Sequence, residues 1–287
     1  MQANEFKKNT IHTISEAHCS ATRLANRDPN MLRIFFDEAL MISSKMNYIY
    51  VHIPKCGCSS VMATLWFHEH RLGHVEHLYP GTPHTMRGSP WWPKNTDANR
   101  STWGEAIKSR FVFTVARNPF VRLLSCYLDK INIDSVLTGT LLKVMGTPER
   151  TTPISFAEFI ETIAAQNAFD MDKHWRIQTE QSYLGLIKYD FIGRIESFTT
   201  DMTFVMGKIF DDKNLPLVRG GTQRHAKELI DTYYDRTTAK IVLEKYWSDF
   251  EFFGYYPDID MTKEVRPKSE IFKSENDESF LATLRSA

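Results

Sequence analysis

The stretch that decides the fold reads Tyr48-Ile49-Tyr50-Val51-His52-Ile53-Pro54-Lys55-Cys56-Gly57-Cys58-Ser59-Ser60. Its first half is rich in β-branched and aromatic residues, its second half is a run of small residues, and a helical pattern follows directly. This order predicts a strand, a loop and a helix. The N–H groups and the dipole at a helix N-terminus favour anions. We therefore interpret the loop as an anion site, to which Lys55 brings a charge and Ser59 and Ser60 bring hydroxyl groups.

The loop alone does not establish phosphate binding, because an ordinary strand-to-helix connection also contains Pro, Gly and Ser. The nucleoside-triphosphate loop Gly-x-x-x-x-Gly-Lys-Ser/Thr is absent, since Lys55 precedes Gly57 and the loop has a single glycine. This difference argues against an ATP-dependent kinase or ATPase.

The composition indicates a large core and no global charge. The chain has 287 residues, of which 42% are hydrophobic and 13% aromatic, and this favours one α/β domain over two small ones. Lys plus Arg equals Asp plus Glu at 35 each, which argues against nucleic acid or an anionic membrane as a partner. The sequence has no apolar run of about 18 residues and no signal peptide pattern at its start. We expect a soluble protein with a local anion site; its oligomeric state stays open.

The cysteines indicate neither disulfides nor a metal. Cys19, Cys56, Cys58 and Cys126 are few for this length, and Cys56 and Cys58 are too close for an ordinary structural bridge. A reducing compartment is the simpler interpretation. The Cys-x-Cys pair lacks the spacing and the Cys/His partners of a zinc site, so we expect no metal.

A second strand-to-helix unit runs from Arg110 to Lys130. The almost continuous apolar run Phe111 to Ala116 predicts a strand that is buried on both faces in a parallel sheet. Asn118 is a good N-cap and Pro119 suits the first helical position, so a helix should begin at once. Arg117 at the carboxyl end of this strand and Ser125 on the helix are suited to contact one phosphate from two sides.

The other segments are less specific. Periodicity predicts helices around residues 29 to 43 and 155 to 165, the second with Ser155 as its cap, and one C-terminal helix that ends at Gly254. The Pro-rich, aperiodic residues 74 to 108 are interpreted as a lid or acceptor loop. Residues 132 to 153 contain two glycines and two prolines and are interpreted as a loop insertion.

Two motifs together resemble the sulfotransferase family. They are Pro54-Lys55-x-Gly57-x-Ser59-Ser60 and Arg117-x-Pro119-x-x-Arg122-x-x-Ser125-x-Tyr127, each after a strand. The closest resemblance is to the carbohydrate sulfotransferases that include the chondroitin and dermatan 4-O-sulfotransferases. It extends over about residues 48 to 256, through Asp172-x-His174-Trp175, Gly193-Arg194-x-Glu196 and the segment from Asp249 to Tyr255.

The resemblance implies a fold and a co-substrate. The fold is a P-loop-like three-layer α/β sandwich with a central, mainly parallel sheet flanked by helices and with long loop insertions. It forms a single domain over residues 1–287, with a core at about 48–256 and a peripheral tail at 258–287. The co-substrate is 3′-phosphoadenosine 5′-phosphosulfate (PAPS). The residues implied for its 5′-phosphosulfate are Lys55, Cys56, Gly57, Cys58, Ser59 and Ser60, and those for its 3′-phosphate are Arg117 and Ser125.

The implied reaction is in-line transfer of the sulfuryl group to a hydroxyl of a carbohydrate or another acceptor. Lys55 would neutralise charge on the leaving phosphate. A general base is also needed, and His suits proton transfer near neutral pH. His174 and His84 are the first candidates for this base, followed by Glu76 and His77.

Two other functions stay open at this point: a nucleotide kinase, and a non-catalytic relative that keeps only the nucleotide site. The better-known animal members of the family carry an N-terminal membrane anchor and work in the Golgi. We expect a cytoplasmic protein if the printed chain is complete, and one of the Golgi lumen if an anchor has been trimmed.

Overall fold

The structure is a computed structural model that describes residues 39–43, 45–72, 109–168, 170–184, 187–211 and 226–259. The chain divides into two compact units. The first, here called the sheet unit, comprises Ile14–Arg117 and Met171–Arg224, and the second, the helical unit, comprises Met1–Thr13, Asn118–Asp170 and His225–Ala287. That the whole chain forms one sulfotransferase-like domain stays a prediction.

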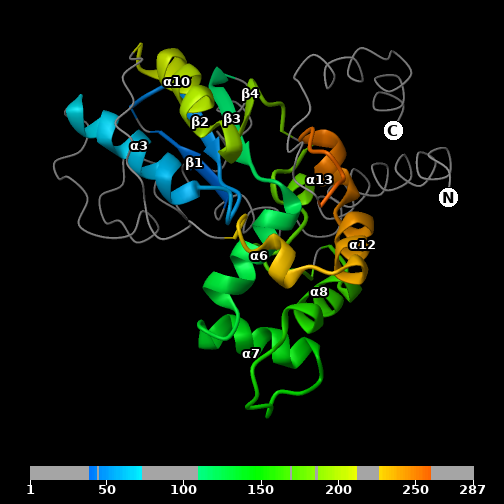
Figure 1. The fold of residues 1–287 in the computed structure, drawn as a ribbon. Coiled ribbons are helices and arrows are strands. Elements are labelled where there is room, and N and C mark those ends of the chain that lie inside the picture. The colour runs from blue at the N-terminus through cyan, green and yellow to red at the C-terminus, as the bar shows by residue number, and fades with distance from the viewer. Residues whose placement is uncertain are drawn as a thin grey trace, which may run out of the picture. The chain divides into compact units, whose positions relative to one another are not determined.

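The sheet unit contains a central sheet, which has four strands in the described residues, in the order β1-β2-β3-β4 (Figure 1). They are β1 (Leu40–Ile42), β2 (Tyr48–Val51), β3 (Phe111–Ala116) and β4 (Phe191–Arg194). β2, β3 and β4 are parallel, whereas β1 is antiparallel to β2. The predicted mainly parallel sheet is thus present, and the carboxyl ends of its parallel strands meet at one edge.

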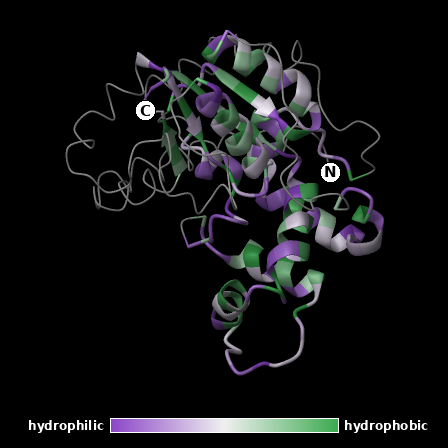
Figure 2. Ribbon diagram, turned by 90° about the vertical axis from the view of Figure 1, so that its left-hand side faces the viewer, coloured by the Kyte–Doolittle hydropathy of each residue, from purple (hydrophilic) through white to green (hydrophobic). Residues whose placement is uncertain are grey.

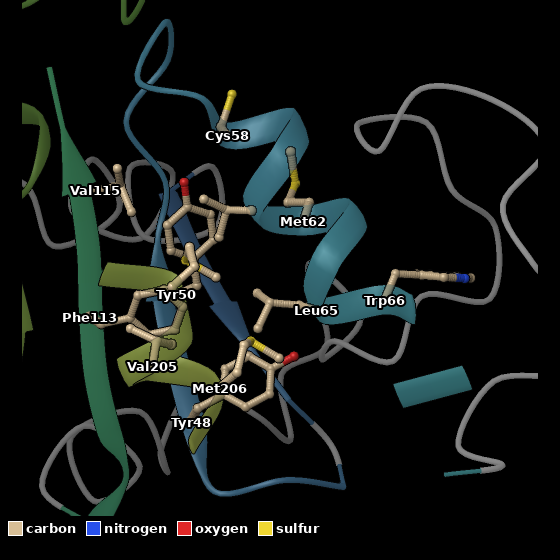
Figure 3. Close-up of a cluster of buried hydrophobic side chains, with 12 residues drawn as sticks. Tyr48, Tyr50, Cys58, Met62, Leu65, Trp66, Phe113, Val115, Val205 and Met206 are labelled. Carbon is tan, nitrogen blue, oxygen red and sulfur yellow. The ribbon is translucent and has the colours of Figure 1, made fainter. Parts of the chain in front are cut away.

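Helices α3 (Cys58–Arg71) and α10 (Phe198–Ile209) pack on one face of this sheet. Figure 3 shows side chains of both helices against the rings of β2 and β3, and the Tyr50 and Phe113 rings stack with centroids 5.1 Å apart. The residues of α3 that the pattern places in the core, Val61, Met62, Leu65 and Trp66, are buried. Leu72 follows the last helical residue and is 51% exposed. Because burying one large apolar side chain stabilises by about 1.5–3 kcal/mol, this cluster fixes α3, and with it the loop that precedes α3.

The other face of the sheet is covered as well. Val51 and Val112 belong to a second buried cluster that includes Tyr183 and Ile187. The strands accordingly carry mainly hydrophobic residues in Figure 2. Burial on both faces confirms the prediction for β3, which spans the same residues as the apolar run in the sequence.

One predicted helix ends earlier than expected, because Ala39 is helical but the residues after it are not. We expected a helix over residues 29 to 43, but Leu40–Ile42 form β1, where Leu40 pairs with Val51 and Ile42 with Ile49. Pairing with β2 gives these residues both backbone partners and a buried neighbour, which local helical spacing does not provide. Most of the predicted helix lies outside the described residues.

The helical unit is built around aromatic side chains. Its described helices are α6 (Pro119–Lys130), α7 (Ser135–Val144), α8 (Phe156–Ala165), α11 (Ile230–Tyr233), α12 (Arg236–Lys245) and α13 (Trp247–Phe252). The Tyr234 ring meets Phe120 edge-on at 5.4 Å and Phe156 at 4.7 Å. The predicted helix over 155 to 165 is confirmed as α8, and Ser155 caps it by accepting from the Glu158 N–H at 3.3 Å.

Helix α7 corrects the expected loop at 132 to 153. The Asp134 carboxylate caps this helix by accepting from the N–H groups of Val136 and Leu137 at 3.0 and 3.2 Å. Gly139 lies within the helix without breaking it, and Gly146, at φ 72°, follows its end. Two glycines suggested a loop, but the second marks a helix end and the first is tolerated inside one.

The C-terminal helical pattern forms two helices rather than one. Ala239 and Val242 lie on α12, Phe250 lies on α13, and all three are buried. Gly254 closes the segment at φ 68°, as predicted. Within the residues that the structure describes, no helix combines the length and apolar character needed to cross a membrane.

Candidate active site

The loop between β2 and α3 has an unusual backbone. Lys55 adopts φ 68° and Gly57 adopts φ 75°. Left-handed backbone is easy for glycine but costs a lysine conformational energy, and such strain concentrates at functional sites. A methyl group on Gly57 would lie 2.3 Å from Ile195 Cδ1, so Ile195 is closely packed on this loop. The loop thus has one backbone path that requires glycine at position 57.

The loop ends at the N-terminus of α3, where Gly57 is the N-cap residue. The Gly57 carbonyl accepts from the N–H groups of Ser60 and Val61 at 2.9 and 3.1 Å. Glycine brings no side chain to cap the first turn, and the helix dipole adds partial positive charge there. Lys55 is 6% exposed beside this turn, while Ser59 and Ser60 are half-buried. The predicted anion site therefore combines a helix N-terminus with a buried lysine.

The two thiols of the loop are free of disulfides and buried. The Cys56 thiol donates a hydrogen bond to Gln178 Oε1 at 3.1 Å. Burial raises the pKa of the Cys58 thiol, and the charge of Lys55 opposes this shift only in part. A neutral thiol at Cys58 adds no negative charge to the loop, which suits a site for an anion.

Arg117 directly follows β3, and the structure brings it to the same loop. Its side chain is buried, and Arg117 Nη1 donates to the Lys55 carbonyl at 3.0 Å. Its main chain is bound by Gln178: the Arg117 N–H donates to Gln178 Oε1 at 3.0 Å, and Gln178 Nε2 donates to the Arg117 carbonyl at 2.8 Å. The Arg117 guanidinium thus contacts the main chain of Lys55, and both residues are buried.

Ser125, the other residue predicted for the second phosphate, lies on α6 in the helical unit and is 6% exposed. Asn118 caps α6 as predicted, because its Oδ1 accepts from the Phe120 N–H at 3.0 Å and Pro119 is the first helical residue. This cap already satisfies an N–H group of the first turn. A ligand at Ser125 would therefore be bound by the Ser125 hydroxyl group rather than by the N–H groups of the first turn of α6.

His174, a candidate for the general base, is paired with Asp172. The two side chains are 2.6 Å apart from Nδ1 to Oδ1, and the same carboxylate oxygen accepts from the His174 N–H at 2.9 Å. Burial alone would raise the pKa of Asp172, but the hydrogen bonds from His174 outweigh it and lower that pKa. An ionised carboxylate on Nδ1 orients the ring and leaves Nε2 to exchange a proton. The rival candidate His84, together with Glu76 and His77, lies outside the described residues.

Three residues at this site were not predicted from the sequence. Gln178 binds both the loop and the strand end, Asp172 orients His174, and Ile195 packs on Gly57. Asp172 is the first residue of the Asp-x-His-Trp segment that carries the family resemblance, and Gln178 lies three residues after its Trp175. The Asp-x-His-Trp segment was therefore the sequence feature that could have pointed to Asp172 and Gln178.

The fold and the site define an α/β protein with buried cations where two parallel strands end in helices. Comparison with known sequences identifies its family: residues 38–256 match the sulfotransferase family, to which the chain belongs. This match agrees with the resemblance noted in the motifs.

Curated relatives are distant. Carbohydrate sulfotransferase 10 of Mus musculus is 19% identical over 258 residues, which cover 83% of this chain and 72% of the relative. Carbohydrate sulfotransferase 8 of Homo sapiens is 25% identical over 250 residues, covering 83% of this chain but 55% of the relative. Carbohydrate sulfotransferase 12 of Xenopus laevis is 20% identical over 251 residues, which cover 75% of this chain and 60% of the relative. No solved structure matches the chain significantly.

Proposed function

We propose that this protein is a PAPS-dependent sulfotransferase that transfers a sulfuryl group to a hydroxyl of a carbohydrate. Family membership supports the reaction class, and the names of the curated relatives support the acceptor class. The observation that carries the proposal is the hydrogen bond from Arg117 Nη1 to the Lys55 carbonyl. It joins the two corners that must serve one nucleotide with phosphates at both ends of its ribose.

The residues present fit such a nucleotide. A helix N-terminus, a glycine where a side chain would intrude, and two buried cations suit a ligand with several negative charges. In the proposed complex the loop from Lys55 to Ser60 holds the 5′-phosphosulfate, and Arg117 and Ser125 hold the 3′-phosphate. We also propose that the sheet unit belongs to a larger P-loop-like three-layer sandwich.

When bound, PAPS supplies the sulfuryl group, and the nucleotide leaves as adenosine 3′,5′-bisphosphate. Lys55 stabilises the charge that develops on the leaving phosphate oxygen. Arg117 binds the remote phosphate and thereby fixes the reacting end. His174, oriented by the Asp172 carboxylate, accepts the proton of the acceptor hydroxyl.

Calorimetric titration with adenosine 3′,5′-bisphosphate and with ATP, followed by transfer from labelled PAPS to a panel of sugars, tests the proposal. We expect the bisphosphate to bind more tightly than ATP and at least one sugar to become labelled. Tighter binding of ATP, with phosphoryl transfer from it, would support the nucleotide kinase instead. Binding of the bisphosphate with no transfer to any sugar, small-molecule or lipid alcohol would support the non-catalytic relative.

The base is tested by comparing His174→Ala with His84→Ala. If His174 is the base, its replacement lowers kcat by about 10²–10⁴-fold. Affinity for the bisphosphate should be unchanged, and His84→Ala should keep its activity. The opposite pattern would assign the base to His84.

A further inference from the structure

Gln178 is a buried amide at the centre of the site. It opens the short helix α9 (Gln178–Gln181), and its exposed fraction is 0%. Burying an amide costs several kcal/mol unless hydrogen bonds compensate. Its oxygen accepts from Cys56 Sγ and the Arg117 N–H, and its nitrogen donates to the Arg117 carbonyl. The amide thus contacts both strand-to-helix corners.

The contacts to Arg117 imitate strand pairing. In a sheet, one residue exchanges an N–H and a C=O with its neighbour, and here the Gln178 side chain makes the same exchange at 3.0 and 2.8 Å. β3 ends at Ala116, so the amide extends the pairing by one residue beyond the strand. This pairing fixes the backbone from which the Arg117 guanidinium projects.

The contacts form a closed ring. Gln178 binds Cys56 on one side and Arg117 on the other, and Arg117 Nη1 returns to the carbonyl of Lys55, the residue before Cys56. Each bond in the ring restricts the others, so the loop and the strand end cannot move apart independently. The loop needs such support because Lys55 holds a left-handed backbone conformation.

We propose that Gln178 is a positioning residue that fixes the spacing between the two phosphate-binding corners. This inference rests on the proposed function, because the spacing matters only for a ligand with phosphates at both ends. In this proposal Gln178 does not bind the nucleotide itself. It holds the loop that carries Lys55, through Cys56, and it holds the main chain of Arg117. Its removal should therefore weaken a bisphosphate more than a monophosphate.

The test compares Gln178→Met with Gln181→Met. Methionine has a similar length but cannot replace the hydrogen bonds of the amide. Gln181 is a matched control, because it is 2% exposed on the same helix and its Oε1 accepts from Arg176 Nη1 at 3.2 Å, not from the loop or Arg117. Cys56→Ala, which removes one bond of the ring, is a milder variant in case Gln178→Met folds poorly.

Affinities for adenosine 3′,5′-bisphosphate and adenosine 5′-monophosphate are measured by calorimetry, and melting temperatures are recorded without ligand. We expect Gln178→Met to weaken the bisphosphate about 10–100-fold, the range typical of residues that support a binding shell. The monophosphate should weaken less, so the ratio of the two affinities falls. Cys56→Ala should shift that ratio in the same direction by a few-fold, and Gln181→Met should leave it unchanged.

Two results overturn the inference in distinguishable ways. If the wild-type protein binds the bisphosphate and Gln178→Met keeps the wild-type ratio of affinities while losing thermal stability as Gln181→Met does, Gln178 is only structural. If the wild-type protein does not bind the bisphosphate, the proposed function itself fails.

Discussion

The two strand-to-helix corners of this protein use the same supersecondary element in different ways. At the β2–α3 corner, the N-cap is Gly57, which has no side chain, and the backbone is left-handed at Lys55 and Gly57. At the β3–α6 corner, the side chain of Asn118 caps the helix and Pro119 occupies its first position. The first helix therefore begins without a side-chain cap, whereas the second begins with one.

If both corners bind an anion as proposed, this difference gives them different means of doing so. The first corner depends on backbone geometry, so a small change in φ should affect binding there. The second corner depends on the Arg117 side chain, so its helix cap should matter for stability alone. Substitutions at the two corners should therefore separate effects on binding from effects on folding.

The largest effect is expected for Lys55→Ala, which should lower kcat about 10²–10³-fold because charge on the leaving group is no longer neutralised. Lys55→Gly is the matched control. It also lacks the amine, but it relieves the left-handed backbone at φ 68°, so it should melt at or above the temperature of Lys55→Ala. Transfer kinetics and thermal melting check both statements. Wild-type turnover in either folded variant would refute the role of the lysine.

Arg117→Ala should weaken adenosine 3′,5′-bisphosphate about 10–100-fold, since hydrogen bonds to charged groups contribute about 1.5–3 kcal/mol. Adenosine 5′-monophosphate lacks the 3′-phosphate and should lose less affinity. Arg117→Lys keeps the charge without the planar fork and should recover part of the loss. Calorimetry with both nucleotides gives these values, and equal losses for the two would place Arg117 elsewhere in the site.

Local sequence signals predicted the elements that they fully specify. The unbroken apolar run of β3 and the Asn118-Pro119 start of α6 need no information from the rest of the chain. β1 was missed because the strand conformation of Leu40–Ile42 comes from its pairing with β2. Helix α7 was missed for a different reason: its Asp134 cap is a local signal, but Gly139 was given more weight.

The site was predictable in the same unequal way. Arg117 directly follows β3 and Lys55 lies four residues after the end of β2, so the sequence places both near the carboxyl edge of the sheet. Gln178 acts on Cys56 across 122 residues and on Arg117 across 61, and no periodicity encodes such contacts. The left-handed conformation of Lys55 was also hidden, because sequence preference assigns that region to glycine.

Gly57→Ala tests the backbone dependence of the first corner. A left-handed non-glycine residue costs about 1–2 kcal/mol, and the new methyl group must displace Ile195 Cδ1 from 2.3 Å. We expect that loss of unfolding free energy, together with severalfold weaker binding of adenosine 5′-monophosphate. Gly146→Ala is the control, because Gly146 has φ 72° and, among the described residues, no atom lies within 4 Å of the place its methyl group would take. Gly146→Ala should lose a similar amount of stability but no affinity for adenosine 5′-monophosphate. If both variants lost affinity equally, the effect of strain on binding would not be specific to the first corner.

The smallest effect on binding is expected for Asn118→Ala at the second corner. Losing the hydrogen bond from the Phe120 N–H should lower the unfolding free energy by about 1 kcal/mol. Asn118→Ser keeps an acceptor and should retain most of that stability. Neither variant should change the affinity for the bisphosphate, because Arg117 is held by Gln178 rather than by the helix cap. Denaturant unfolding and calorimetry decide the matter: a clear loss of affinity in Asn118→Ala, absent in Asn118→Ser, would show that the cap of α6 also positions Arg117.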